Sequence, residues 1–374
     1  MKQTNTWKFF DTILVLCSVG ILLIFCVGLL LLPQREMSER ENRMLRRWES
    51  SSWQSVLEGS FSDEVGSVVR DQFPMREAWV SLKARCEQML GKRENNGVLL
   101  GADGYLMARN EYVELSVAER NLRSVEEFSK RVKGSLTQLW IPRSCDVMSK
   151  WLPEHYPSDA ARRLFQMLNG TPQSFLQEAV AEGGEVYYKT DHHLTTEGAY
   201  LLYCWLGDQL GYVPRGRDSF SVETVSKEFF GSADSAVGGI ASRADTVELY
   251  RYDGDDGFLV TNREMGSVRS GFYDWSALER KDQYSIFLGG NFAHLSVREV
   301  GVEKPRLLLI KDSFANALVP FLAIHFDLEI VDLRYVSGEI FVDSCDGMLI
   351  LHGIDTLATD PSLGKIDWIQ YKNG

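Results

Sequence analysis

The sequence predicts an α/β fold in which one apolar helix precedes a large globular region. Two observations predict it: buried apolar strands alternate with amphipathic helices through much of the chain, and residues 12–32 carry no charge. Alternation of this kind favours a sheet with helices on both faces. Of the 374 residues, 44% are hydrophobic and 25% charged, so the chain can bury a full core.

The charge-free stretch predicts a membrane anchor. As a helix it would be about 32 Å long, which is enough to cross a bilayer. A cleaved signal peptide would have a shorter apolar region that ends in small residues, whereas this one meets Pro33-Gln34-Arg35. We therefore expect a short tail over residues 1–11 and a single uncleaved span over residues 12–32.

The charges around this span give an orientation that conflicts with the function inferred below. Lys2 and Lys8 precede the span, and five arginines follow it within fifteen residues. Counted by themselves, these charges would place the large domain in the cytoplasm.

Overall charge and cysteine usage exclude some classes of protein. A net charge of −12 argues against nucleic acid as a partner, because phosphate binding needs a basic face. Six cysteines without a CxxC pair indicate neither a disulfide scaffold nor a zinc site. Pairing among the four outside the span stays open; these are Cys86, Cys145, Cys204 and Cys345.

The elements after the span follow in order. Residues 33–70 read as a charged juxtamembrane segment with a helix near residues 54–69, and residues 71–374 read as the main domain. A Gly-, Ser- and Asp-rich stretch at about 214–280 is expected to be an irregular, β-rich insertion. The main domain is expected to contain a hairpin at 95–106 and helices at 77–90, 118–132, 160–168, 172–182, 200–210 and 315–325. Strands are expected at 139–142, 185–188, 284–288, 306–310, 328–332 and 348–351, with β-type pieces of the insertion at 246–252 and 258–260.

The stretch from Tyr187 to Tyr200 predicts the base of a nucleophilic site. Asp191 and His193 are two residues apart, so in an extended segment their side chains point the same way. Asp191 can then accept from one ring nitrogen and leave the other free to take a proton. A polar loop is the plain alternative, and His192 beside this pair also invites a metal interpretation, which we set aside because no further ligands lie nearby.

The nucleophile is expected at Ser313. The apolar strand at 306–310 runs directly into a helix, and Ser313 lies at the junction, where open α/β sheets place their ligands. The helix N-terminus favours a developing oxyanion, and the Ser313 N–H can donate to it. Gly289 and Gly290 let the backbone approach a substrate, and the Asn291 amide can donate to the oxyanion. Helix capping and an ordinary turn are the plain alternatives.

Several other residues are predicted to lie at or near this site. Arg143 and Ser144 follow the strand at 139–142 and are expected to face the pocket. Supporting roles are expected for His192, Lys311, Asp312 and Asn316. No metal and no cofactor are expected.

Six motifs in one order resemble the DHHW family of bacterial surface proteins and, more distantly, the SGNH-like domains of alginate O-acetyltransferases. The resemblance extends from about Glu39 to the end of the chain, with one departure, Leu194 in place of the family's Trp. The motifs are Asp71–Arg76, Asn96–Val98, Lys189–His193, Phe287–Asn291, Lys311–Asn316 and Asp332–Tyr335.

The resemblance implies an SGNH-hydrolase-like three-layer α/β/α domain in which Asp191 orients His193, His193 is the base and Ser313 is the nucleophile. It implies an O-acyltransferase, expected to be an O-acetyltransferase, that works through an acyl-serine. The acceptor would be a cell-surface polysaccharide, and the donor a polytopic partner of the membrane-bound O-acyltransferase type. The anchor would then contact membrane lipid and hold the domain outside the cytoplasm.

Two other functions use the same fold. An esterase would use the same three residues with water as the acceptor. A glycan-binding or assembly protein would keep the fold without catalysis.

Overall fold

The computed structural model describes residues 3–38, 40, 43–48, 60–109, 115–132, 134–154, 156, 162–168 and 171–371. The chain divides into two compact units, one of residues 1–91 with 238–240 and one of residues 92–237 with 241–374. The helix expected at 54–69 falls largely outside the described residues. All six cysteines are free thiols.

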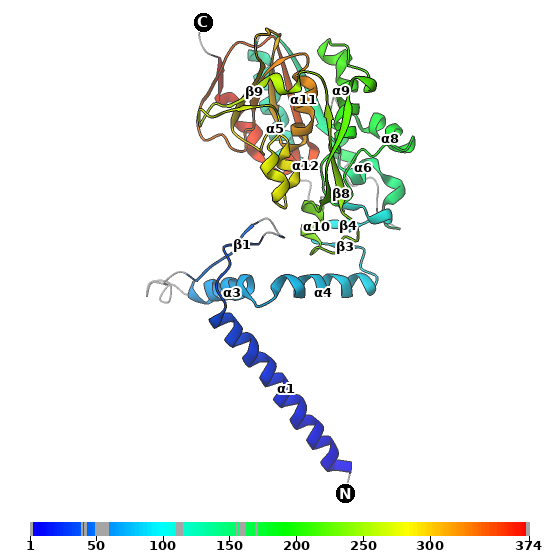
Figure 1. Ribbon diagram of the computed structural model, residues 1–374, viewed down its shortest axis with the longest axis vertical. Helices are drawn as coiled ribbons and strands as arrows, with labels where there is room; N and C mark the ends of the chain where they lie inside the picture. Colours follow the sequence, from blue (N-terminus) through cyan, green and yellow to red (C-terminus); the bar gives the residue numbers. More distant parts are fainter. Residues whose placement is uncertain are drawn as a thin grey trace. The chain divides into compact units, whose positions relative to one another are not determined.

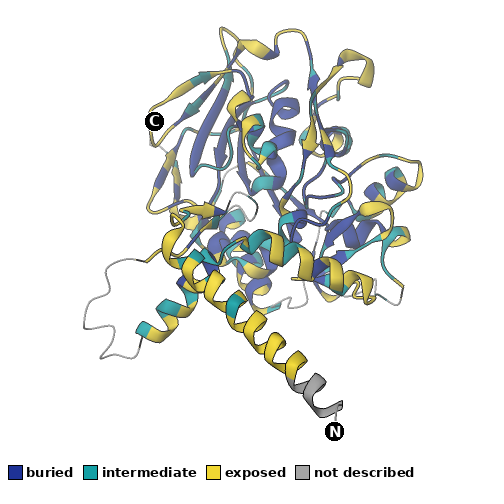
Figure 2. Ribbon diagram, turned by 60° about the horizontal axis from the view of Figure 1, so that its bottom comes forward, coloured by how far each residue is buried: buried dark blue, intermediate teal, exposed yellow. Residues whose placement is uncertain are grey.

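The first unit contains the expected apolar helix. Its elements are α1 (Gln3–Leu31), β1 (Met37–Ser38), β2 (Arg43–Met44), α3 (Phe61–Gln72) and α4 (Arg76–Met89). Within α1, Phe9–Leu31 forms 23 residues that are apolar enough to cross a bilayer, and their side chains are largely exposed (Figure 2). The helix begins at Gln3 and so includes most of the expected tail.

Asp71, in the first of the family motifs, fastens the segment after α1 to the end of α3. Its carboxylate accepts two hydrogen bonds from the Arg43 guanidinium, at 3.0 and 2.7 Å, and one from the Arg46 N–H at 2.9 Å. The Arg43 hydrogen bond is the main cause that lowers the pKa of the buried Asp71 carboxyl to about 2.

The second unit is built on a seven-stranded mixed sheet (Figure 1). The strand order is β10-β9-β11-β13-β12-β15-β6. Four neighbouring strands are parallel, and three antiparallel strands complete one side. The bounds are β6 (Ser135–Ile141), β9 (Phe258–Asn262), β10 (Val268–Ser270), β11 (His294–Glu299), β12 (Arg306–Lys311), β13 (Asp327–Val331) and β15 (Gly347–Gly353).

Both faces of this sheet are buried, which explains why the central strands read as continuous apolar runs rather than as alternating ones. Along β12, Leu307 and Leu309 belong to one core cluster, and Leu308 and Ile310 to the other. The first cluster includes residues of α6 (Ser144–Val147), α8 (Gln173–Ala181), α9 (Thr196–Leu210) and α11 (Val319–Leu322). The second includes residues of α5 (Leu115–Arg131), α7 (Arg162–Gln166), α12 (Ile354–Thr359) and the 3-10 helix η8 (Pro361–Trp368). The expectation of an α/β fold is confirmed.

The remaining elements form small sheets and short helices. The hairpin expected at 95–106 is present, since β4 pairs antiparallel with β5. The other strands are β3 (Glu94–Asn95), β4 (Val98–Leu100), β5 (Leu106–Ala108), β7 (Ser221–Phe229), β8 (Asp245–Arg251), β14 (Ile340–Val342) and β16 (Ile369–Tyr371). The other helices are α10 (Ser232–Ala236) and the 3-10 helices η1 (Ala102–Gly104), η2 (Ser149–Trp151), η3 (Arg217–Ser219), η4 (Asp255–Gly257), η5 (Trp275–Glu279), η6 (Gln283–Ile286) and η7 (Ser313–Leu318).

Three local expectations were wrong. Residues 284–288 are not a strand: they form the end of η6 and the two residues that follow it. Residues 185–188 contribute only a single β-bridge, from Tyr187 to Leu194. The expected insertion supplies β9 and β10 to the main sheet, although β7 and β8 do form a separate ribbon. The strand β11 was missed because His294, Ser296, Arg298 and Glu299 break its apolar pattern.

Candidate active site

Ser313 lies where β12 turns into η7, at the carboxyl edge of the parallel strands. Asp312, the residue before it, holds this turn. The Asp312 carboxylate accepts from the backbone N–H groups of Phe314 at 3.0 Å and Gly353 at 2.8 Å, and from the Thr356 hydroxyl at 2.7 Å. Because three elements meet on one buried carboxylate, the turn that carries Ser313 is held in place.

Asp191 and His193 lie in a tight loop closed by the Tyr187–Leu194 bridge. Directly after the loop, Thr195 caps α9 and accepts from the Gly198 N–H at 3.0 Å. The backbone and side chain of Thr190 donate to Asp245 at 2.7 and 2.6 Å, which ties the loop to β8. A short loop with fixed ends is a rigid support for the two side chains.

The structure brings Asp191, His193 and Ser313 into one chain of hydrogen bonds. Asp191 Oδ1 lies 2.6 Å from His193 Nδ1, and His193 Nε2 lies 2.8 Å from Ser313 Oγ. A carboxylate can only accept, so the imidazole proton is on Nδ1 and Nε2 accepts from the serine hydroxyl. The arrangement can move a proton from Ser313 to His193.

Asp191 is ionised in this setting. Burial opposes its charge, but His193 and His192 beside it and its hydrogen bonds hold the pKa of the carboxyl below its usual range. Its second oxygen accepts from the N–H and the hydroxyl of Ser232, at 2.7 and 2.8 Å. All of these contacts favour a fixed carboxylate oriented toward the imidazole.

Tyr284 packs against the imidazole of His193. Its ring is stacked on that of His193, with centroids 3.8 Å apart and planes 6° apart, and its hydroxyl donates to the Ser313 carbonyl at 3.0 Å. Phe314 meets the imidazole edge to face at 5.3 Å. The base and the nucleophile therefore share one buried aromatic support.

The metal interpretation concerns the same loop. Asp191, His192 and His193 offer three ligand atoms within 4.8 Å of one another. Both Asp191 oxygens and both His193 nitrogens already have hydrogen-bond partners, and His192 Nδ1 lies 2.6 Å from Ser232 Oγ. Hydrogen bonding accounts for the positions of all three side chains.

The loop before β11 carries the expected oxyanion residues. Leu288, Gly289 and Gly290 all have positive φ, of 65°, 80° and 114°, so the chain reverses sharply just before Asn291. Asn291 precedes a strand instead of following one. Lys311 donates to Asn291 Oδ1 at 2.8 Å, so this loop is joined to the end of β12.

Arg143 and Ser144 are both buried at the end of β6. The Arg143 guanidinium binds Asp146 through two hydrogen bonds of 2.7 and 2.8 Å. Burial opposes the charge of Arg143, but the Asp146 carboxylate raises the pKa of the guanidinium above its usual range. The structure therefore gives Arg143 a partner inside the protein.

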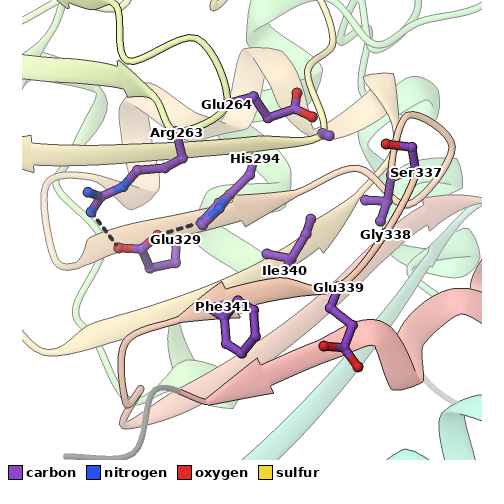
Figure 3. Close-up of a pocket in the computed structure, with 11 residues that line it drawn as sticks. Arg263, Glu264, His294, Glu329, Ser337, Gly338, Glu339, Ile340 and Phe341 are labelled. Atoms are coloured by element: carbon purple, nitrogen blue, oxygen red, sulfur yellow. Dashed lines mark hydrogen bonds and ion pairs between the residues drawn. The ribbon is translucent and has the colours of Figure 1, made fainter.

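A pocket lies around β11 and β13, apart from Asp191, His193 and Ser313 (Figure 3). It is a pocket of about 480 Å³ in which His294 and Arg263 both reach Glu329, at 2.8 and 3.2 Å. None of its described lining residues is a predicted site residue. They are Arg263, Glu264, Ala293, His294, Glu329 and residues 336–341.

Sequence reasoning missed Ser232, Tyr284 and Asp245, all of which contact the site. Tyr284 falls in a segment that the sequence predicts to be a strand, and Ser232 and Asp245 fall in the expected insertion. Their only local signals are the Gly231-Ser232 pair before a short helix and an aspartate at the start of β8. Neither signal points to a distant catalytic loop.

Comparison with known proteins shows which family and which solved structures this chain resembles. The family model described as "DHHW protein" matches residues 175–331, a range that holds Asp191, His193, Asn291 and Ser313. The resemblance to DHHW proteins inferred from the motifs is confirmed.

Individual relatives extend the comparison. A probable alginate O-acetylase AlgJ of Azotobacter vinelandii is 23% identical over 46% of this chain and 49% of its own length. The chain thus spans about half the length of the curated relatives it matches. A DHHW family protein of Eubacterium siraeum is similar over 75% of this chain and 98% of its own, with a TM-score of 0.60 at 18% identity. PatB1 of Bacillus cereus, in a structure with a sulfonyl adduct, is similar over 72% of this chain and 97% of its own, with a TM-score of 0.55 at 18% identity. At these identities the solved structures show a shared fold.

Proposed function

We propose that this protein is a membrane-anchored O-acyltransferase that transfers an acyl group, expected to be acetyl, to a cell-surface polysaccharide. The observation that carries the proposal is the hydrogen-bonded chain from Asp191 through His193 to Ser313 at the carboxyl edge of the sheet. The proposal includes the SGNH-like architecture expected from the resemblance. It also includes a triad whose residues follow the order Asp, His, Ser along the chain.

In the first half-reaction Ser313 Oγ attacks the carbonyl carbon of an activated acyl donor. His193 Nε2 takes the hydroxyl proton, and Asp191 stabilises the imidazolium that forms. The Ser313 N–H at the start of η7 and the Asn291 amide donate to the oxyanion. The bond from the carbonyl carbon to the leaving group then breaks, and His193 gives its proton to that group, which leaves acyl-Ser313.

In the second half-reaction a sugar hydroxyl replaces the serine. His193 takes the proton of the sugar hydroxyl, whose oxygen attacks the acyl carbon. The bond between Ser313 Oγ and the acyl group breaks, and the proton passes from His193 to Ser313. Acceptor and donor therefore bind in turn, as in ping-pong transfer.

The identity of the acceptor and donor rests on the relatives. AlgJ is named for alginate, so a polysaccharide acceptor is proposed for this chain as well. The acyl group is proposed to be handed over by a polytopic partner of the membrane-bound O-acyltransferase type. The helix Phe9–Leu31 would anchor the protein beside that partner, with the second unit outside the cytoplasm.

The test uses the full-length protein in detergent. It is incubated with p-nitrophenyl acetate or with a sulfonyl fluoride and analysed by intact-protein and peptide mass spectrometry. We expect one acetyl or sulfonyl group on the Ser313 peptide, none in Ser313→Ala, and much slower formation in His193→Ala. The control is Ser296→Ala, which removes a buried serine from β11 and should leave labelling unchanged.

Labelling of Ser313→Ala at the wild-type rate would refute the proposal. Acetyl transfer to an added oligosaccharide, read by mass spectrometry, separates a transferase from an esterase, which would only release acetate.

A further inference from the structure

Lys311 is a lysine without any exposed surface, directly at the end of β12 and two residues before Ser313. Its ammonium group lies 2.8 Å from Asn291 Oδ1, 2.7 Å from Asn316 Oδ1 and 3.7 Å from Asp332 Oδ2. Burying a charge is costly unless it is paired and hydrogen-bonded. Two of the ammonium N–H groups are therefore taken by amide oxygens, and Asp332 is an ion-pair partner beyond hydrogen-bond distance.

The contact with Lys311 decides which way the Asn291 amide faces. An ammonium group only donates, so the amide atom toward it must be the oxygen. Asn316 Nδ2 donates to the same oxygen at 3.2 Å. With its oxygen held by two donors, Asn291 turns its NH2 group away from Lys311, and within the described part of the chain this group has no hydrogen-bond partner.

We propose that Lys311 is a positioning residue that orients the Asn291 amide as an oxyanion donor for the acyl transfer at Ser313. The inference rests on the function proposed above. Lys311 and Asn316 lie on either side of Ser313 in the chain, so the group that orients the amide moves with the nucleophile. The sharp reversal at Leu288–Gly290 supplies the backbone, and Lys311 supplies the side-chain orientation.

The Asp332 carboxylate favours the protonated form of Lys311. Asp332 lies fully buried beside it. Its two carboxylate oxygens accept from Nε and Nη2 of Arg334, at 2.9 and 2.7 Å. Replacing Lys311 with Met therefore leaves Asp332 paired with Arg334. Methionine is also unbranched and flexible enough to fill the space of the lysine stem. A folded variant is expected.

The arrangement has a consequence for pH. Burial lowers the pKa of Lys311 to about 8; the Asp332 and Asp312 carboxylates counteract this effect, and the Arg334 guanidinium adds to it. His352 also interacts electrostatically with Lys311. A neutral amine accepts hydrogen bonds as well as donating them, so above this pH the Asn291 amide is free to turn over. The acylation rate of the wild type should therefore fall as pH rises through about 8.

The experiment is a double-mutant cycle on the full-length protein, with acylation by p-nitrophenyl acetate as the readout. Removing a preorganised oxyanion donor costs about 10²–10³-fold in rate, so Asn291→Ala should fall in this range. Lys311→Met should lower kcat about 10- to 100-fold, with KM unchanged and without the fall above pH 8. The double variant should match Asn291→Ala, because Lys311 acts only through that side chain.

The control variant is Lys304→Met. Lys304 lies just before β12, donates to the Ala323 carbonyl at 2.7 Å and pairs with Glu299 at 2.6 Å. Lys304→Met therefore removes a hydrogen bond and an ion pair, as Lys311→Met does, but away from Ser313. It should keep the wild-type rate. If Lys311→Met does not fold, Asn316→Ala takes its place, since it removes one of the two donors to Asn291 Oδ1 and leaves the charge of Lys311.

The outcomes separate this inference from the proposed function. Acylation of Ser313→Ala at the wild-type rate removes the proposed function and the inference together. If Ser313 is required, the inference is overturned by a wild-type rate in Lys311→Met, by losses that add in the double variant, or by a wild-type rate in Asn291→Ala.

Discussion

Gly231 packs directly against Asp191 and leaves no room there for a Cβ. Its backbone is ordinary, with φ of −82° and ψ of −166°, so alanine can adopt it without strain. Space is the obstacle: a Cβ there would lie 2.2 Å from Asp191 Cβ and 2.4 Å from Asp191 Oδ2. Carbon atoms normally pack at about 3.5 Å or more, so Asp191 would have to move by roughly 1.3 Å.

Such a movement breaks the site before it breaks the fold. The Asp191–His193 hydrogen bond is 2.6 Å long, and a shift of this size takes it past about 3.5 Å, where it no longer holds the imidazole. Misplacing a catalytic group by about 1 Å costs about 10²-fold, and losing the orienting carboxylate costs up to about 10⁴-fold. Overpacking itself costs about 1–3 kcal/mol, or roughly 2–6 °C in Tm.

Gly231→Ala is therefore expected to lower the acylation rate about 10²- to 10⁴-fold while the protein remains folded. The rate is measured with p-nitrophenyl acetate, and folding by circular dichroism during heating. Gly364→Ala is the matched control, since a Cβ at Gly364, in η8, meets nothing within 4 Å. A wild-type rate in Gly231→Ala, with Tm equal to that of the control, would show that Asp191 is not held as described.

Two further predictions concern the aromatic support and the first unit. Tyr284→Phe keeps the stacked ring but loses the 3.0 Å hydrogen bond to Ser313, so acylation should fall about 2- to 10-fold, and about 10²-fold in Tyr284→Ala; equal rates in the two variants would contradict a role for the ring. Asp71→Asn should destabilise the protein by about 1 kcal/mol at pH 7, because Arg43 lowers the pKa of Asp71 to about 2 while being partly exposed itself. This stability is present above the unfolded pKa near 3.8 and is lost as pH falls through about 2, so denaturant titrations of variant and wild type should converge at low pH. An undiminished difference at pH 2, or one as large in the exposed control Asp63→Asn, would count against this account.

Much of the sheet was predictable because its strands are buried on both faces. The segments 306–310 and 348–351 are mainly apolar runs of strand length, and each lies in a parallel strand of the structure. The segment 328–332 lies largely in a parallel strand as well, although Glu329 and Asp332 interrupt its apolar pattern. The antiparallel side was not predictable in the same way. β11 mixes His294, Ser296 and Arg298 with apolar residues, so its pairing with β13 depends on contacts far along the chain.

The residues of the candidate site also differ in how far the sequence could predict them. Asp191 and His193 are two residues apart and Ser313 stands at a strand-to-helix junction, so local geometry alone suggested their side chains. Ser232 and Tyr284 contact these side chains from elements whose sequences carry no such pattern.

The sequence by itself determined the α/β class and the apolar helix near the N-terminus, and it indicated the residue types that the proposed acyl transfer needs, because each depends on local periodicity or spacing. Only the tertiary structure decided how far apart the groups lie. It brought His193 to 2.8 Å from Ser313 across 120 residues of chain, and it placed Gly231 against Asp191 where no larger residue fits. The reason is physical: hydrogen-bond distances and steric limits are set by packing between distant segments, which no short stretch of sequence records.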